Sequence, residues 1–148
     1  MQVLLDTGVL LRLLDRSDPH HADIRGALRK LRARGDTPVT SSQNIAEFWN
    51  VCTRPASARG GYGLSVAETE RRARLLERLF PVLTETPASY PLWRNLVVAH
   101  GVQGVQVHDS RLVAIMQTYG VTHILTLNSA DFARYYATVV AVTPPIVP

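Results

Sequence analysis

The sequence predicts an α/β fold with a mainly parallel sheet. Short apolar runs, each the length of a buried strand, alternate along the chain with longer segments whose apolar residues recur at helical spacing. Strands that alternate with helices are typical of parallel sheets, because each parallel connection needs a crossover. The chain has no repeats or low-complexity tracts, and its 148 residues predict one domain, residues 1–148.

The N-terminal part begins with a buried strand. Residues 2–5 are a continuous apolar run, and residues 7–14 then carry apolar side chains at helical spacing. Residues 20–34 predict a second helix, which Gly35 ends. A short strand follows at 38–40.

The middle of the chain predicts two helices joined by a loop. Either Ser41 or Ser42 caps a helix that runs to about Thr53, and residues 56–63 are a loop of small residues and glycine. Ser65 and Glu68 have the spacing of a capping box for the next helix, which runs to Phe80.

The C-terminal part alternates in the same way. Its predicted elements are, in order, a strand at 81–84, helices at 87–99 and 108–119, a strand at 123–126, a turn at 127–130, a short helix from Asp131 and a last strand at 138–142.

Composition is that of a globular protein, with 46% hydrophobic and 19% charged residues. The single cysteine, Cys52, excludes an internal disulfide framework and indicates a reducing cytosol. The N-terminus lacks a basic signal-peptide region, and no apolar run approaches the length of a membrane span. We therefore expect a soluble, cytoplasmic protein, with Cys52, Trp49 and Trp93 in its core.

The basic residues are almost all arginine: Lys30 is the one lysine among 16 basic side chains, and the formal net charge is +4. Base composition of the genome together with solubility explains this balance, and so does contact with phosphate, for which the planar donors of arginine are well suited. Net charge alone does not decide between the two.

Four acidic residues lie at the end of a predicted strand or within a predicted helix. Asp6 ends the first strand, Glu47 lies in a predicted helix, and Asp131 follows the strand at 123–126. Asp109 lies in the first turn of a helix, on the stripe that faces the core, where a carboxylate must be capped, paired or bound to a metal.

Each acid also has a structural interpretation. Asp6 and Asp131 are suitable N-caps, and Asp109 suits the positive end of its helix. Glu47 points away from the apolar stripe of its helix, which predicts a solvated position. If the acids converge instead, they repel one another, and a hard divalent ion, Mg²⁺ or Mn²⁺, relieves that repulsion. Zinc is disfavoured, because no histidine and cysteine set has suitable spacing.

In three segments the chain resembles the PIN domain of the VapC toxin ribonucleases. The segments are VLLDTGVLL, SSQNIAEFWNVCTRP and HDSRLVAIMQTYGVTHILTLNSADF, and together the resemblance spans roughly Val3 to Val142. It implies a Rossmann-like three-layer α/β/α sandwich and Mg²⁺-dependent endoribonuclease activity. Ser110 departs from the family, which often has alanine at that position.

The resemblance also implies roles for individual residues. Asp6, Glu47, Asp109 and Asp131 form the acidic quartet, with Asp6 and Asp109 as the firmest metal ligands. The supporting polar residues are Thr7, Thr126 and Asn128. Either Asn128 or Asp131 completes the site, and the sequence does not choose between them. A VapB antitoxin as partner and a homodimer are further implications.

The loop from Arg54 to Gly63 is a candidate for contact with RNA. Arg54 and Arg59 supply charge, the glycines supply mobility, and Tyr62 suits stacking on an unpaired base. An ordinary connection between two helices explains the loop equally well. Transfer RNA and ribosomal RNA are both candidate substrates.

Other protein classes fit less well. A haloacid-dehalogenase phosphatase needs a second aspartate where Gly8 stands, and a response-regulator receiver needs a late lysine. A nucleotide-binding fold needs more glycine after the first strand. The remaining alternative is a catalytically weak PIN domain that binds RNA or an antitoxin without cleavage.

Overall fold

The computed structural model describes residues 1–147, and its centre is a five-stranded sheet in which every strand runs parallel to its neighbours. The strands are β1 (Gln2–Leu5), β2 (Thr37–Ser41), β3 (Val82–Leu83), β4 (His123–Leu125) and β5 (Val140–Val142). Their order in the sheet is β3-β2-β1-β4-β5. The predicted parallel sheet is therefore confirmed.

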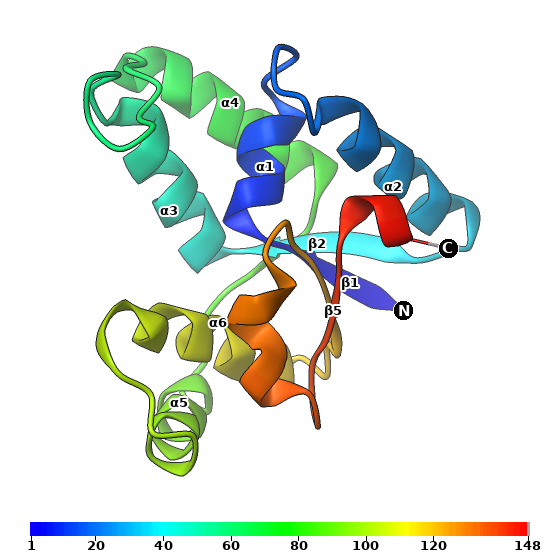
Figure 1. Ribbon diagram of the computed structural model, residues 1–148, viewed down its shortest axis with the longest axis vertical. Coiled ribbons are helices and arrows are strands. Elements are labelled where there is room, and N and C mark those ends of the chain that lie inside the picture. Colours follow the sequence, from blue (N-terminus) through cyan, green and yellow to red (C-terminus); the bar gives the residue numbers. More distant parts are fainter. Residues whose placement is uncertain (148) are drawn as a thin grey trace.

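Helices cover both faces of the sheet (Figure 1). The α-helices are α1 (Thr7–Leu13), α2 (His21–Ala33), α3 (Ser42–Thr53), α4 (Val66–Leu79), α5 (Ser89–Ala99) and α6 (Val107–Thr118). Short 3-10 helices are η1 (Gly104–Gln106), η2 (Ser129–Tyr135) and η3 (Pro144–Ile146). In Figure 1, α1 to α4 lie on one side of the strands, and α5 and α6 lie on the other.

The core is divided by the sheet into two apolar clusters. Val3 and Leu5 of β1 belong to the cluster beneath α1 to α4, whereas Leu4 belongs to the cluster beneath α6. This division follows from the strand, because successive side chains point to opposite faces. The three-layer α/β/α sandwich implied by the family resemblance is thus confirmed.

The sheet contains a topological switch point between β1 and β4. The chain leaves β1 toward β2 on one side, whereas β4 and β5 lie on the other side. Asp6 directly follows β1, and Thr126 directly follows β4. In open parallel sheets ligands bind outside the carboxyl ends of the strands at such a point. The fold therefore brings Asp6 and Thr126 to the edge where a site is expected.

Serine side chains cap two helices as the sequence suggests. The Ser41 hydroxyl accepts a hydrogen bond from the backbone N–H of Asn44 at 3.1 Å, so Ser41, and not Ser42, is the N-cap of α3. Ser65 caps α4 in the same way, with the N–H of Glu68 at 3.1 Å. The Glu68 carboxylate pairs with Arg71 and Arg72.

Some predicted details were wrong. The short helix from Asp131 is the 3-10 helix η2, and the last strand begins at Val140, because Thr138 and Val139 donate back to the carbonyl of Tyr135. Tyr119, which directly follows α6, is 39% exposed. The core side of α6 extends over five consecutive buried residues, 112–116. Within residues 1–147 no helix has the length and apolar character to span a membrane.

Candidate active site

Asp6 is held in one orientation by hydrogen bonds to both carboxylate oxygens. Oδ1 accepts from the backbone N–H of Thr7 at 2.7 Å, and Oδ2 accepts from the hydroxyl of Thr126 at 2.7 Å. The first bond makes Asp6 the N-cap of α1, so the structural interpretation of this residue is confirmed. The second bond joins the ends of β1 and β4. Asp6 is therefore fixed at the switch point of the sheet.

Glu47 of α3 faces the same site. Its Oε2 accepts from the Thr7 hydroxyl at 2.6 Å, and its Oε1 accepts from the side-chain amide of Gln43 at 2.8 Å. The sequence-based expectation of a solvated Glu47 was wrong. The helical wheel correctly placed Glu47 on the side of α3 opposite its apolar stripe. That side is not open to solvent, however, because α1 packs against α3.

Polar residues at the beginning of α3 support this arrangement, and the sequence analysis did not single them out. The Gln43 amide also donates to the backbone carbonyl of His108 at 2.9 Å, which links α3 to α6. Asn44 is fully buried and donates to the Thr7 hydroxyl at 3.0 Å, while its own oxygen accepts from Ser41. The available signal was a run of polar residues, SSQN, between an apolar strand and an apolar helix.

Asp109 lies within the electric field of the other three acids. It is partly buried in the first turn of α6, and its pKa is raised to about 6. Burial is the largest cause, followed by the negative charges of Asp131, Asp6 and Glu47, while Arg134 opposes the shift. Four acids from four parts of the chain thus gather at one edge of the sheet.

Asp6 experiences the same repulsion, and its pKa is raised. Burial is again the largest cause, and the charges of Glu47 and Asp131 act in the same direction. The hydrogen bonds from Thr126 and Thr7 oppose the shift, because they favour the ionised carboxylate. The two hydrogen bonds therefore do not fully offset the effect of burial and nearby negative charge on the ionised Asp6 carboxylate.

Asn128 lies on the turn after β4, Asp131 lies in the first turn of η2, and both are exposed. The backbone N–H of Asn128 donates to the Thr126 hydroxyl at 3.1 Å, which connects this turn to Asp6 through one threonine. The N-cap of η2 is Asn128, so the interpretation of Asp131 as an N-cap was wrong.

The donor set suits a hard divalent cation, since carboxylate, hydroxyl and amide oxygens are the ligands that Mg²⁺ and Mn²⁺ prefer. The buried Oε1 of Gln43, beside Glu47, also lacks a hydrogen-bond partner. In residues 1–147, however, no three acidic, histidine or cysteine side chains are already arranged around one ion position.

Ser110, the departure from the family pattern, has a structural role next to Asp109. It is fully buried, and its hydroxyl lies 2.7 Å from that of Tyr135 and 3.2 Å from the carbonyl of Gln106. The serine thus provides a hydrogen-bond partner for a buried tyrosine hydroxyl.

The loop after α3 is more tightly ordered than its glycines suggest. Tyr62 and Gly63 donate backbone hydrogen bonds to the end of α3, and a Cβ at Gly61 would meet the carbonyl oxygens of Arg54 and Pro55 at 2.5 Å. This glycine therefore permits close packing and does not supply mobility. Tyr62 packs against the first core cluster, and burial raises the pKa of its hydroxyl, so the ring is only partly available for stacking. Arg59 is exposed, and contact of this loop with RNA stays a prediction.

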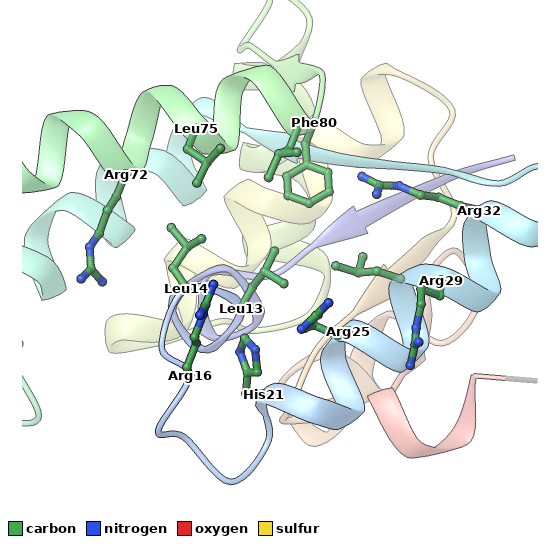
Figure 2. A pocket seen from close by; sticks show the side chains of 12 residues that line it. Leu13, Leu14, Arg16, His21, Arg25, Arg29, Arg32, Arg72, Leu75 and Phe80 are labelled. Atoms are coloured by element: carbon green, nitrogen blue, oxygen red, sulfur yellow. The ribbon is translucent and has the colours of Figure 1, made fainter.

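A separate groove of about 530 Å³ lies between α2 and α4 (Figure 2). Its floor is apolar and its rim carries five arginines: Arg16, Arg25, Arg29, Arg32 and Arg72. The Arg32 guanidinium lies 5.7 Å from the centre of the Phe80 ring, which also lines the groove. None of the four acids lines this arginine-rimmed groove, so it is distinct from the acidic site.

Comparison with known proteins bears on the family and the fold of the chain. A model of the PIN domain family matches residues 3–137. No curated protein matches the chain.

Several solved structures share the fold at low sequence identity. VapBC2 from Rickettsia felis, solved with a DNA fragment from its promoter, is 12% identical, with 97% of this chain and 98% of that chain covered and a TM-score of 0.66. VapC20 of Mycobacterium tuberculosis, a toxin that cleaves the Sarcin-Ricin loop, is 18% identical, with 95% and 98% covered and a TM-score of 0.63. FitAcB from Neisseria gonorrhoeae is 20% identical, with 97% and 98% covered and a TM-score of 0.65.

Proposed function

The chain belongs to the PIN domain family, and from its acidic site we propose that it is a metal-dependent endoribonuclease, the toxin of a toxin–antitoxin pair. One observation carries the proposal: four carboxylates gather at the switch point of the sheet, where negative charge from the other acids helps to raise the pKa values of Asp6 and Asp109. Repulsion between these carboxylates lowers the stability of the metal-free protein. The same repulsion favours binding of a divalent cation, which neutralises the negative charge.

Each residue has a distinct part in the proposed site. Asp6, whose orientation is fixed by Thr7 and Thr126, would be the anchoring ligand for Mg²⁺ or Mn²⁺, and Asp109 would be the second. Glu47, held by Thr7 and Gln43, would accept a proton or orient a water molecule near the scissile phosphate. When bound, the ion supplies Lewis-acid polarisation of the phosphate and lowers the pKa of water.

RNA is the proposed substrate, on two grounds. VapC20, which shares this fold, is a toxin that cleaves the Sarcin-Ricin loop, an RNA. The excess of arginine over acidic residues also suits a polyanion. The alternative of a binding module without turnover is separated from the enzyme by metal-dependent cleavage.

An antitoxin is the proposed protein partner, because the VapBC2 and FitAcB structures are of this kind of pair. We propose that it occupies the arginine-rimmed groove, whose apolar floor and basic rim suit an amphipathic segment with acidic residues. A homodimer, implied by the resemblance, stays a prediction that sedimentation of the purified chain tests.

Cleavage of total cellular RNA by purified protein tests the proposed activity. We expect discrete fragments with Mg²⁺ or Mn²⁺ and none with EDTA. Asp6→Asn and Asp109→Asn should each lower the rate by at least about a hundredfold, because an amide keeps the shape of the ligand but removes its charge.

The matched control is Asp23→Asn, which removes an exposed acid in the first turn of α2, away from the site, and should cleave like the wild type. Circular dichroism of each variant establishes that the fold is retained. Full activity of the folded Asp109→Asn variant would contradict the metal-site assignment. Absence of cleavage by folded, metal-loaded wild type would favour the binding module.

A further inference from the structure

An aromatic cavity of about 290 Å³ lies between α5 and the beginning of α6. The indole N–H of Trp93 donates to the carbonyl of Val107 at 3.0 Å, which fixes the partly buried ring at the wall of this cavity. The Tyr90 ring is 64% exposed, and its centre is 5.9 Å from that of Trp93, with the two planes inclined by 40°. The expectation that Trp93 is a core residue was therefore wrong. One anchored ring and one largely free ring form a surface for stacking.

The aromatic cavity adjoins the acidic site through two residues of α6. His108 and Arg111 line it, and both also line a second cavity of about 600 Å³ whose wall includes Glu47. The side-chain amide of Gln43 donates both to Glu47 and to the backbone carbonyl of His108. This pair of bonds fixes the aromatic cavity relative to the acids.

Several polar groups around the aromatic cavity already have partners within the protein. The Ser89 hydroxyl accepts from the backbone N–H of Thr86 at 3.0 Å, and the Trp93 N–H is bonded to Val107. Glu85 pairs with Arg111. The walls thus offer ring faces more than free hydrogen-bonding groups, which favours an occupant that binds by stacking.

The side chain of Arg111 is 49% exposed where the two cavities meet. Its guanidinium can pair with Glu85 through Nε and still present other N–H groups to an anion. A flat aromatic group next to an anion is the repeating pattern of a single-stranded nucleic acid.

We propose that the aromatic cavity holds one unpaired base of the RNA strand, beside the phosphodiester at the acidic residues, with Tyr90 and Trp93 as its stacking surface. Its volume is at the small end of ligand pockets, which suits one base better than a protein segment. Because stacking increases with ring area, the cavity selects a purine over a pyrimidine. The inference rests on the proposed function, since it assigns a substrate subsite to the same nuclease.

Fluorescence of Trp93 tests this subsite without any cleavage. The chain has two tryptophans, so Trp49→Phe leaves Trp93 as the sole reporter. Titration in EDTA with short oligoadenylate or oligouridylate should quench the fluorescence, and the oligoadenylate should bind more tightly. Equal affinity for the two oligonucleotides would overturn the purine preference.

Substitution of Tyr90 tests the stacking surface. Tyr90→Ala should weaken oligoadenylate binding by about tenfold, whereas Tyr90→Phe, which retains the ring, should bind like the parent protein. The matched control is Tyr136→Ala, because Tyr136, which directly follows η2, is 83% exposed and does not line the cavity. Its removal should leave the affinity unchanged.

Two outcomes would overturn the inference. In the first, Tyr90→Ala binds as tightly as its parent. In the second, Tyr90→Ala converts a dimer into a monomer, which would identify the cavity as a surface covered by a second copy. The binding titration is carried out in EDTA and needs no cleavage, so its result tests only the base subsite. The cleavage assay tests the proposed nuclease activity separately.

Discussion

At the scale of single residues, the acidic site is defined by where its charges are held. Asp6 has hydrogen bonds to both oxygens, and Glu47 has hydrogen bonds to both of its own. The pKa of Asp109 is raised to about 6, mainly by burial and by the negative charges around it. Hydrogen bonds therefore fix the orientations of Asp6 and Glu47. At Asp109, burial and nearby negative charge disfavour the ionised carboxylate.

The raised pKa of Asp109 predicts that the stability of the metal-free protein depends on pH. In the folded state Asp109 keeps its proton up to about pH 6, whereas its ordinary pKa is 3.8. The unfolded chain therefore ionises first, and the folded state loses stability from this residue as the pH rises from about 4 to about 6. Asn at this position does not ionise, so Asp109→Asn should gain about 1–2 kcal/mol over the wild type across that range.

Urea denaturation in EDTA, at several pH values from about 4 to 7, measures this difference in the free energy of unfolding. The comparison with wild type removes the contributions of the other titrating groups, such as Glu68 and Glu85, whose pKa values are lowered by their arginine partners. Asp23→Asn serves as the control and should show no trend. A difference for Asp109→Asn that is constant with pH would contradict the assigned shift.

At the scale of elements, the segment after α3 illustrates how a glycine-rich sequence can form an ordered loop. Its backbone returns to the end of α3 through hydrogen bonds from Tyr62 and Gly63, and the Arg54 guanidinium donates to the carbonyl of Arg59 at 3.0 Å. Arg59 adopts a positive φ of 43°, and its side chain is exposed. The loop thus offers two cations on a fixed backbone.

Neutralisation of these two cations tests the predicted contact with RNA. Arg54→Gln combined with Arg59→Gln should weaken RNA binding and lower the slope of its salt dependence by about two, one for each lost phosphate contact. Filter binding in EDTA over a series of salt concentrations gives both quantities. Arg78→Gln, which removes an exposed arginine of α4, should leave the slope unchanged. If the double variant has the slope of the wild type, the loop is only a connection between helices.

At the scale of the whole molecule, the fold separates two surfaces of opposite charge. The acids gather at the carboxyl ends of β1 and β4, whereas the arginine-rimmed groove lies between α2 and α4. Figure 2 shows arginines of α2 and Arg72 of α4 around an apolar floor. A partner can therefore occupy the groove through contacts that are separate from those of the acidic site.

A designed peptide tests the chemistry of that groove. An amphipathic helix with leucines on one face and flanking glutamates should bind the wild type, with an affinity that falls as salt rises. Arg25→Glu combined with Arg29→Glu should weaken binding by at least about tenfold, because like charges then face each other. RNA cleavage by this variant should be retained.

Calorimetry with the same peptide, and with a version in which lysine replaces glutamate, measures the contribution of charge. Arg78→Glu on α4, outside the groove, is the protein control. Binding of the lysine peptide as tightly as the glutamate peptide would leave only the apolar floor as a recognition element.

The fold and part of the site could be predicted from local patterns. Apolar runs and helical spacing predicted the strands and helices, because each pattern arises from burial of one face of one element. Asp6 could be identified because it directly follows a buried strand. A residue in that position lies at the carboxyl-end edge of a parallel sheet, whichever strands are its neighbours. The resemblance to a family supplied Glu47, which the helical wheel assigned to solvent.

Other features depended on contacts between distant segments. The bonds of Thr126 to Asp6, and of Gln43 to both Glu47 and His108, join residues far apart in the chain, so no local pattern contains them. The raised pKa of Asp109 likewise needs three other acids to be brought near it. The sequence by itself determined which elements form and which faces they bury. Only the tertiary structure decided which polar side chains meet, because electrostatic and hydrogen-bonding interactions depend on distance in space.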